Sequence, residues 1–306
     1  MATRKEVQNR IRSVKNIHKI TRAMEMVAAA RLRRAEQRID AMRPYAQAIR
    51  KMTRQVSEAA GASLARVPLL EERENVKTAA ILLVTGDRGL AGSFNTQIIR
   101  EGQRLGREWD SDGVAVVFSV VGKRGNSSLR FRGEEVTNTY VGFTDRPAFI
   151  NAREISKDLI AAYVDEEVDQ VDVIYNRYVS PLTQYVRRQR LLPVQHAEVF
   201  GEGLPEPEQP SDSELAEAHE KALWIYEPDA DELLPQLVEE YVDLSIYRAL
   251  LESAASEHGA RMTAMRNAAE NAQDMIEQLS LEMNRVRQAE ITQEILEVVG
   301  GAEALG

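Results

Sequence analysis

The chain contains no cysteine and only four histidines. Without thiols it has no disulfide framework, no thiolate metal site and no cysteine nucleophile. Close spacing of the kind that zinc ligands usually show is absent from the histidines, which are His18, His196, His219 and His258. The longest apolar run, Ala79 to Val84, is far shorter than the roughly 20 residues that a membrane-spanning helix needs. We therefore expect neither a metal centre nor a membrane span.

A glycine-rich loop follows that apolar run. Gly86, Gly89 and Gly92 lie between a predicted strand and a predicted helix, an arrangement that can hold a phosphate. The loop lacks the lysine of a Walker motif, and its glycines do not follow the G-x-G-x-x-G spacing of dinucleotide-binding proteins. The chain also lacks the nucleophile elbow of a hydrolase. We interpret the loop as a structural turn and expect no catalytic residue and no cofactor.

Charges of opposite sign gather at the two ends of the chain. Residues 1–54 contain 15 Lys and Arg against four Asp and Glu, whereas residues 208–306 contain six against 22. The net charge of -9 disfavours nucleic-acid binding. The basic end offers an arginine-rich face that could attract acidic partner surfaces, or that could be solvated and pair with the acidic end. Its members are Arg10, Arg12, Arg31, Arg33 and Arg34.

Both ends are predicted to be long helices, Arg4 to Val56 and Asp231 to Val298. In the first, apolar residues recur in steps of three and four and form the stripe Val7, Ile11, Val14, Ile17, Ile20, Met24, Ala28, Leu32, Ala35, Ile39, Met42, Ala46 and Ile49. The second carries the heptad stripe Met265, Ala269, Ala272, Ile276, Leu279, Met283 and Val286. Since a narrow stripe on so long a helix buries too little alone, we expect an antiparallel coiled coil, the basic helix against the acidic one.

The middle of the chain predicts a compact α/β domain. Its expected strands are Lys77 to Thr85, Val114 to Val121, Val171 to Val179 and Tyr185 to Val194, and its expected helices include Asn95 to Glu108 and Ala148 to Asp165. The predicted fold is therefore a long antiparallel two-helix coiled coil formed by the chain termini, with an inserted Rossmann-like α/β domain. We place the N-terminal helix in residues 1–60, the inserted domain in 76–200 and the C-terminal segment in 210–306.

The heptad stripe of the last helix is predicted to end near Glu290, which is a poor core residue. Beyond it the helix should stand alone. At about 100° per residue, Gln288 and Thr292 lie about 200° and about 240° from Val286, so both should face away from the partner helix.

Three stretches resemble one family along the whole chain, namely "KITRAMEMVAAARLRRA" (Lys19 to Ala35), "TGDRGLAGSFN" (Thr85 to Asn95) and the last segment, "SEHGARMTAMRNAAENAQDMI" with "NRVRQAEITQEILEVVGGAEAL". They are similar to the gamma subunit of the bacterial F-type ATP synthase. Ala91 stands where that family usually has a cysteine, and Glu290 stands where it usually has a small residue. The absence of cysteine argues against the redox-regulated chloroplast form.

The resemblance implies a non-catalytic rotor peripheral to the cytoplasmic face of a bacterial plasma membrane. In that family the coiled coil stands inside a ring of alpha and beta subunits, and the inserted domain sits with the epsilon subunit on the membrane ring of c subunits. Proton flow turns the shaft, which forces the catalytic beta subunits through different states. A non-rotary coiled-coil scaffold is the alternative that the residues alone leave open, and it would form a homodimer.

The resemblance also implies contact residues on the helix tip. In the family, the residues matching Arg287, Gln288 and Thr292 meet a loop of a beta subunit. The apolar end, Ile295, Leu296, Val298 and Val299, is expected to sit in a smooth collar formed by the ring. Met24 is either a partner contact or part of the coiled-coil core, since methionine fills irregular gaps.

Overall fold

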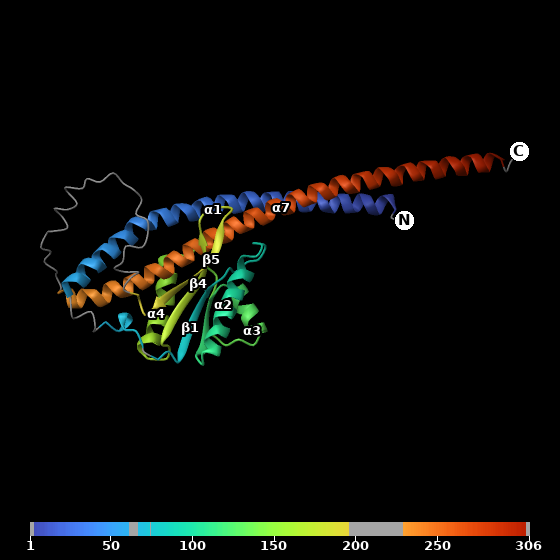
Figure 1. The fold of residues 1–306 in the computed structure, drawn as a ribbon. Helices are drawn as coiled ribbons and strands as arrows, with labels where there is room; N and C mark the ends of the chain where they lie inside the picture. The colour runs from blue at the N-terminus through green and yellow to red at the C-terminus, as the bar shows by residue number, and fades with distance from the viewer. Residues whose placement is uncertain (1–2, 61–66, 74, 196–228, 304–306) are drawn as a thin grey trace.

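The computed structural model describes residues 3–60, 67–73, 75–195 and 229–303. Two long helices form a rod, and a sheet with shorter helices lies against one part of it (Figure 1). The rod helices are α1 (Arg4–Ala60) and α7 (Ala230–Glu303), which come from the two ends of the chain. At 1.5 Å per residue they are about 85 Å and about 110 Å long. The predicted fold class, a terminal coiled coil with an inserted α/β domain, is confirmed.

A heptad seam joins the two rod helices. On α1, buried or half-buried side chains recur in alternating steps of four and three residues from Val7 to Val56. Ile11 clusters with Leu279 near the N-terminus of α1, and Leu32 clusters with Ala255 farther along. Rising residue numbers on α1 therefore meet falling numbers on α7, so the two helices are antiparallel.

The predicted stripe is wrong in one stretch of α1. The side chains of Ile17 and Ile20 are 52% and 59% exposed, whereas Thr21 and Glu25 are buried. Continuing the heptad count from Val7 leads to Thr21 and Glu25, so two polar residues hold the seam here. The stripe predicted from hydrophobicity alone contains Ile17 and Ile20, each of which lies one residue before a position of the seam.

A five-stranded sheet forms the inserted domain, with the strand order β3-β2-β1-β4-β5. Its strands are β1 (Thr78–Val84), β2 (Ala115–Val121), β3 (Val136–Tyr140), β4 (Gln170–Tyr178) and β5 (Gln184–Leu192). All neighbouring pairs are parallel except β4 and β5. The four predicted strands are confirmed to within two residues at each end. The fifth, β3, was not predicted because it is short and largely polar.

Helices cover both faces of the sheet. On one face, α2 (Phe94–Ser111) and α3 (Lys123–Phe131) enclose a core that includes Ile81 and Leu83. On the other face, α4 (Phe149–Val164), the short 3-10 helix η2 (Pro68–Leu70) and part of the rod enclose a core that includes Leu82. Alternate residues of β1 therefore serve opposite cores, as a doubly wound sheet requires. Of these elements, α3 and η2 were not predicted.

The middle of α7 is buried on all sides. Every residue from 249 to 259 is buried, because α1 packs on one side of this stretch and the inserted domain on the other (Figure 1). Across the described ranges, no helix combines the length and the apolar character that a membrane crossing requires.

Candidate functional site

The tip of α7 projects beyond the N-terminus of α1 (Figure 1). Burial along the seam fades there, since Met283 and Val286 are half-buried and the apolar side chains that follow are exposed. These are Ile291, Ile295, Leu296, Val298 and Val299, with exposed fractions between 48% and 72%. The tip is thus a single helix with unburied apolar side chains, as expected from the end of the heptad stripe.

Polar residues that were predicted to contact a partner lie at the base of this tip. Arg287, Gln288 and Thr292 are all exposed. The hydroxyl of Thr292 donates a hydrogen bond of 2.9 Å to the backbone oxygen of Gln288, one turn earlier. The Gln288 side chain and the Arg287 guanidinium therefore face solvent on an isolated helix.

The arginines of the basic face do not pair with α7 in the part of the chain that the structure describes. Arg10, Arg12, Arg33 and Arg34 are exposed, and Arg31 binds Asp145 of the inserted domain at 2.6 Å. In the ion pair between Glu25 and Arg266 the signs are reversed, because the basic helix α1 supplies the acid and the acidic helix α7 supplies the base. Of the alternatives left open for this face, pairing of these arginines with the acidic helix is therefore wrong, whereas a solvated face and attraction to a partner both remain open.

An exposed apolar stripe on α1 was missed by the sequence reasoning. Ile17, Ile20 and Val27 are more than half exposed, while Met24 between them is half-buried. Strict heptad counting from Val7 would have revealed them, since it places all four beside the seam.

The rod crosses the crevice in which doubly wound sheets usually bind ligands. That crevice lies at the carboxyl ends of β1 and β4, where the strand order reverses. Here α7 fills it. The hydroxyl of Ser253 donates to the backbone oxygen of Val84 at the end of β1, and that of Ser256 donates to the backbone oxygen of Asn176 on β4.

The glycine loop after β1 packs against a carboxyl group of α7. Glu257 is fully buried, and its carboxyl group lies against Gly86, where an added Cβ would be 2.7 Å from Oε1. Arg261 pairs with Oε1 of Glu257 at 2.5 Å and also donates to the backbone oxygen of Gly89 at 3.3 Å. Two residues of α7 therefore hold the loop, one by close contact and one by a hydrogen bond.

The loop between β3 and α4 is attached to the rod at the same level. His258 of α7 contacts the backbone oxygen of Asp145 through Nε2, at 3.3 Å, and burial lowers the pKa of its imidazole to about 4. A neutral ring can donate from Nε2 while Nδ1 accepts from Arg261 at 3.4 Å. The side chain of Asp145 in turn binds Arg31 of α1. Both rod helices therefore hold the inserted domain.

The N-terminus of α3 is capped by a carboxylate of the glycine loop. Oδ1 of Asp87 accepts from the backbone N–H of Lys123 at 3.1 Å, and Oδ2 accepts from that of Gly142 at 2.8 Å. An internal carboxylate thus occupies a helix N-terminus that could otherwise attract an anion.

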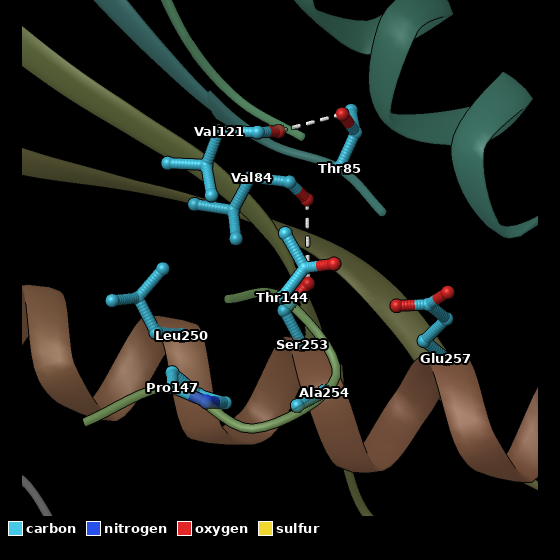
Figure 2. Close-up of a pocket in the computed structure, with 9 residues that line it drawn as sticks. All are labelled: Val84, Thr85, Val121, Thr144, Pro147, Leu250, Ser253, Ala254 and Glu257. Atoms are coloured by element: carbon cyan, nitrogen blue, oxygen red, sulfur yellow. Dashed lines mark hydrogen bonds between the residues drawn. The ribbon is translucent and has the colours of Figure 1, made fainter. Parts of the chain in front are cut away.

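A small cavity lies beside Glu257. Its volume of about 10 Å³ is about what one water molecule needs. Figure 2 shows Ser253 and Glu257 rising from α7 towards Val84 and Thr85 at the end of β1. Oε2 of Glu257 is buried and has no hydrogen-bond partner among the residues that the structure describes. Among the described residues, no group of His, Asp and Glu side chains could hold a metal ion.

These features define a class of protein, a rod-shaped subunit that carries an α/β domain at one level and presents a bare helical tip. The family model described as ATP synthase matches residues 3–305. The chain belongs to the family of ATP synthase gamma chains.

Its relatives match over nearly their full lengths. The ATP synthase gamma chain of Kineococcus radiotolerans is 42% identical, with 97% of this chain and 95% of that chain covered. The gamma chain of Thermobifida fusca is 40% identical over the same shares. A chain in the cryo-EM structure of the central stalk and c-ring of the Tetrahymena thermophila mitochondrial ATP synthase is 26% identical, with a TM-score of 0.58. That match covers 81% of this chain and 99% of the other.

Proposed function

We propose that the chain is the rotor of the central stalk in a bacterial F-type ATP synthase and that it catalyses no reaction itself. Proton flow turns a c-ring, the c-ring turns this chain, and the asymmetric rod drives the catalytic beta subunits through their conformational cycle. The observation that carries the proposal is the bare apolar tip at the end of an intramolecular coiled coil. A tip of this kind suits a bearing, because unburied apolar side chains need a partner surface.

The proposed partners divide between the two ends of the molecule. The rod and its tip stand inside the hexamer of alpha and beta subunits, whereas the inserted domain meets the epsilon subunit and the c-ring. The chain is then held at the cytoplasmic face of the plasma membrane through the complex.

The contact residues follow from that placement. Arg287, Gln288 and Thr292 bind a loop of a beta subunit, and Met24 contacts the ring farther down the rod. The apolar collar receives Ile295, Leu296, Val298 and Val299. The exposed arginines Arg10, Arg12, Arg33 and Arg34 face acidic ring surfaces, which is supported by their lack of ion pairs with the described residues.

Reconstitution tests the proposal. The purified chain is mixed with alpha and beta subunits from a close relative, and the soluble complex is isolated and assayed for ATP turnover. We expect the wild-type chain to co-elute with the ring and to support turnover. The double variant Ile295→Glu with Val298→Glu should assemble poorly, because the collar would have to bury two charges.

Phe131→Glu is the matched control, since Phe131 is 92% exposed on α3, away from the rod. It should assemble and turn over like wild type. A wild-type chain that elutes as a homodimer without the ring would contradict the rotor and support the scaffold alternative.

A further inference from the structure

The joint between the rod and the inserted domain contains a buried charged side chain, Glu257 of α7, that contacts the glycine loop. Most of the neighbouring buried residues on α7 are short, including Ser253, Ala254, Ala255 and Ser256. Glu257 extends past them and places its carboxyl group against the backbone of Gly86. The side chain therefore meets the loop where the loop has no side chain of its own.

We propose that Glu257 is a positioning residue that sets the orientation of the inserted domain on the rod. The proposal rests on the proposed function, because orientation matters only if torque passes between the domain and the rod. The residue acts through its contact with the glycine loop.

Several attachments surround Glu257 and fix the domain from different directions. The hydroxyls of Ser253 and Ser256 bind β1 and β4, and these two bonds hold the strand ends along the helix axis. The contacts of Arg261 to Gly89 and of His258 to Asp145 hold two loops. Glu257 lies between the strand ends and the loops, so its bulk limits how far the sheet can tilt about the helix.

The pKa of Glu257 is raised above its ordinary value. Burial raises the pKa of Glu257, Arg261 lowers it less, and the nearby carboxylates of Asp145 and Asp87 raise it further. Other charged groups near the joint include Arg31 of α1 and Arg88 of the glycine loop, both of which bind Asp145, and Arg124 of α3, which lies against Gly89. Because the contact with Gly86 depends on the size and shape of the side chain, glutamine should position the domain as well as Glu257 does, whereas a truncated side chain should not.

Distance measurements on the full chain test this directly, because the chain has no native thiol to interfere with spin labelling. Labels at Ser127→Cys on α3 and Asn271→Cys on α7 report the domain against the rod. Labels at Ser13→Cys and Asn271→Cys report the rod alone and serve as the control pair. All three sites are exposed.

We expect Glu257→Ala to broaden the distribution of distances between the domain and the rod, while Glu257→Gln keeps the wild-type distribution. The pair within the rod should not change in either variant. A wild-type distribution in Glu257→Ala, or equal broadening in Glu257→Gln, would overturn the proposal.

Gly86→Ala supplies a second variant in case Glu257→Ala fails to fold. The new methyl group would lie within 2.9 Å of three carboxyl atoms of Glu257, so the side chain or the loop must shift. We expect a shifted or broadened distribution in Gly86→Ala, and an unchanged one would overturn the proposal. Where Glu257→Ala does fold, adding it to Gly86→Ala should leave the distribution no broader than in Glu257→Ala alone.

A coupling measurement separates this inference from the proposed function. In membranes that contain the complete complex, Glu257→Ala should lower proton pumping per ATP hydrolysed, whereas Glu257→Gln should retain it. ATP turnover by the soluble ring complex should stay at the wild-type level in both, because the tip is intact. Unchanged coupling with a working complex overturns the inference, while a wild-type chain that never assembles overturns the proposed function.

Discussion

Arg266 on α7 reaches across the rod to Glu25 on α1, with Nε 3.1 Å from Oε1 of the carboxylate. Glu25 occupies a buried heptad position, so this pair replaces an apolar contact within the seam. Arg22, one turn earlier on α1, binds the second carboxylate oxygen at 2.6 Å. Polar groups inside a coiled coil commonly fix its register at some cost in stability, and this pair stands where the apolar stripe is interrupted.

Glu25→Gln should therefore lower the free energy of unfolding at pH 7 by about 1–2 kcal/mol. This loss lies between the contribution of an exposed ion pair and the cost of breaking a fully buried one. Burial alone would raise the pKa of Glu25, but the hydrogen bonds and charges of Arg266 and Arg22 outweigh burial and lower it. A carboxyl group whose folded pKa is lowered stabilises the fold above its unfolded pKa of about 4.3, and this contribution is lost as the pH falls through the folded value.

Urea unfolding at a series of pH values measures both effects. The difference between wild type and Glu25→Gln should be full near neutral pH and should shrink below about pH 4. Glu270→Gln, an exposed site on α7, is the control and should match wild type. A constant difference at every pH would show that the charge of Glu25 does not contribute.

Hydrophobic periodicity predicted the two rod helices, but it did not predict everywhere which of their residues face the partner helix. The heptad stripe on α7 was predicted correctly, because apolar or small residues hold each position from Met265 to Val286. On α1 the stripe was misplaced at Ile17 and Ile20, because the buried positions there belong to polar residues. Arg266 of the partner helix and Arg22 of α1 both bind the carboxylate of Glu25 and make its burial favourable, and a pattern of apolar residues does not reveal such an ion pair.

The antiparallel register predicts a disulfide within one chain. Ile11→Cys combined with Leu279→Cys should form an intramolecular bond on oxidation, since both side chains lie in the same buried cluster. Non-reducing gel electrophoresis should show a faster-migrating monomer. The pair Ile17→Cys with Leu279→Cys is the control and should stay reduced, because Ile17 points outward. A covalent dimer in the first pair would mean that the coil forms between two chains.

A close helix contact in the inserted domain predicts the cost of a single methyl group. Gly102 lies on the face of α2 that meets the sheet, and an added Cβ would be 2.6 Å from Cδ2 of the fully buried Leu83. Alanine improves helix propensity by about 1 kcal/mol, but overpacking a rigid core costs typically 1–3 kcal/mol. Gly102→Ala should therefore lower the free energy of unfolding by about 1 kcal/mol.

Leu83→Val tests whether this clash causes the loss of stability, because it removes both Cδ atoms that the new methyl group would meet. In thermal or urea unfolding, the double variant should lose less stability than the sum of the two single variants. Strict additivity would mean that Gly102 is required for another reason.

The contact surface was predictable in part. The end of the heptad stripe at Glu290 is visible in the sequence, so an isolated tip could be expected there. The joint was not predictable, because Glu257, Gly86 and Asp145 are far apart in sequence and meet only after α7 crosses the sheet. The same crossing explains why a loop that looks suited to a phosphate instead packs on a helix of its own chain.

The base of the tip allows the rotor contact to be tested without disturbing the fold. Gln288 and Thr292 are exposed, and the hydrogen bond from Thr292 to the backbone of Gln288 adds little to a helix. Replacing both by alanine should therefore change the chain's own free energy of unfolding by less than about 0.5 kcal/mol. Assembly or ATP turnover of the complete complex should fall, because the proposed hydrogen bonds to a beta subunit are lost.

Thr96→Ala combined with Thr137→Ala is the matched control, since both side chains are exposed polar groups on the inserted domain. It should match wild type in soluble ring complexes, because the proposed placement leaves the inserted domain outside the ring. Thermal unfolding of the isolated chains and turnover of the assembled complexes are measured side by side. If the tip variant assembled and turned over like the control, the beta-subunit contact would have to lie elsewhere on the rod, and the exposed stripe around Ile17 and Ile20 would be the next surface to change.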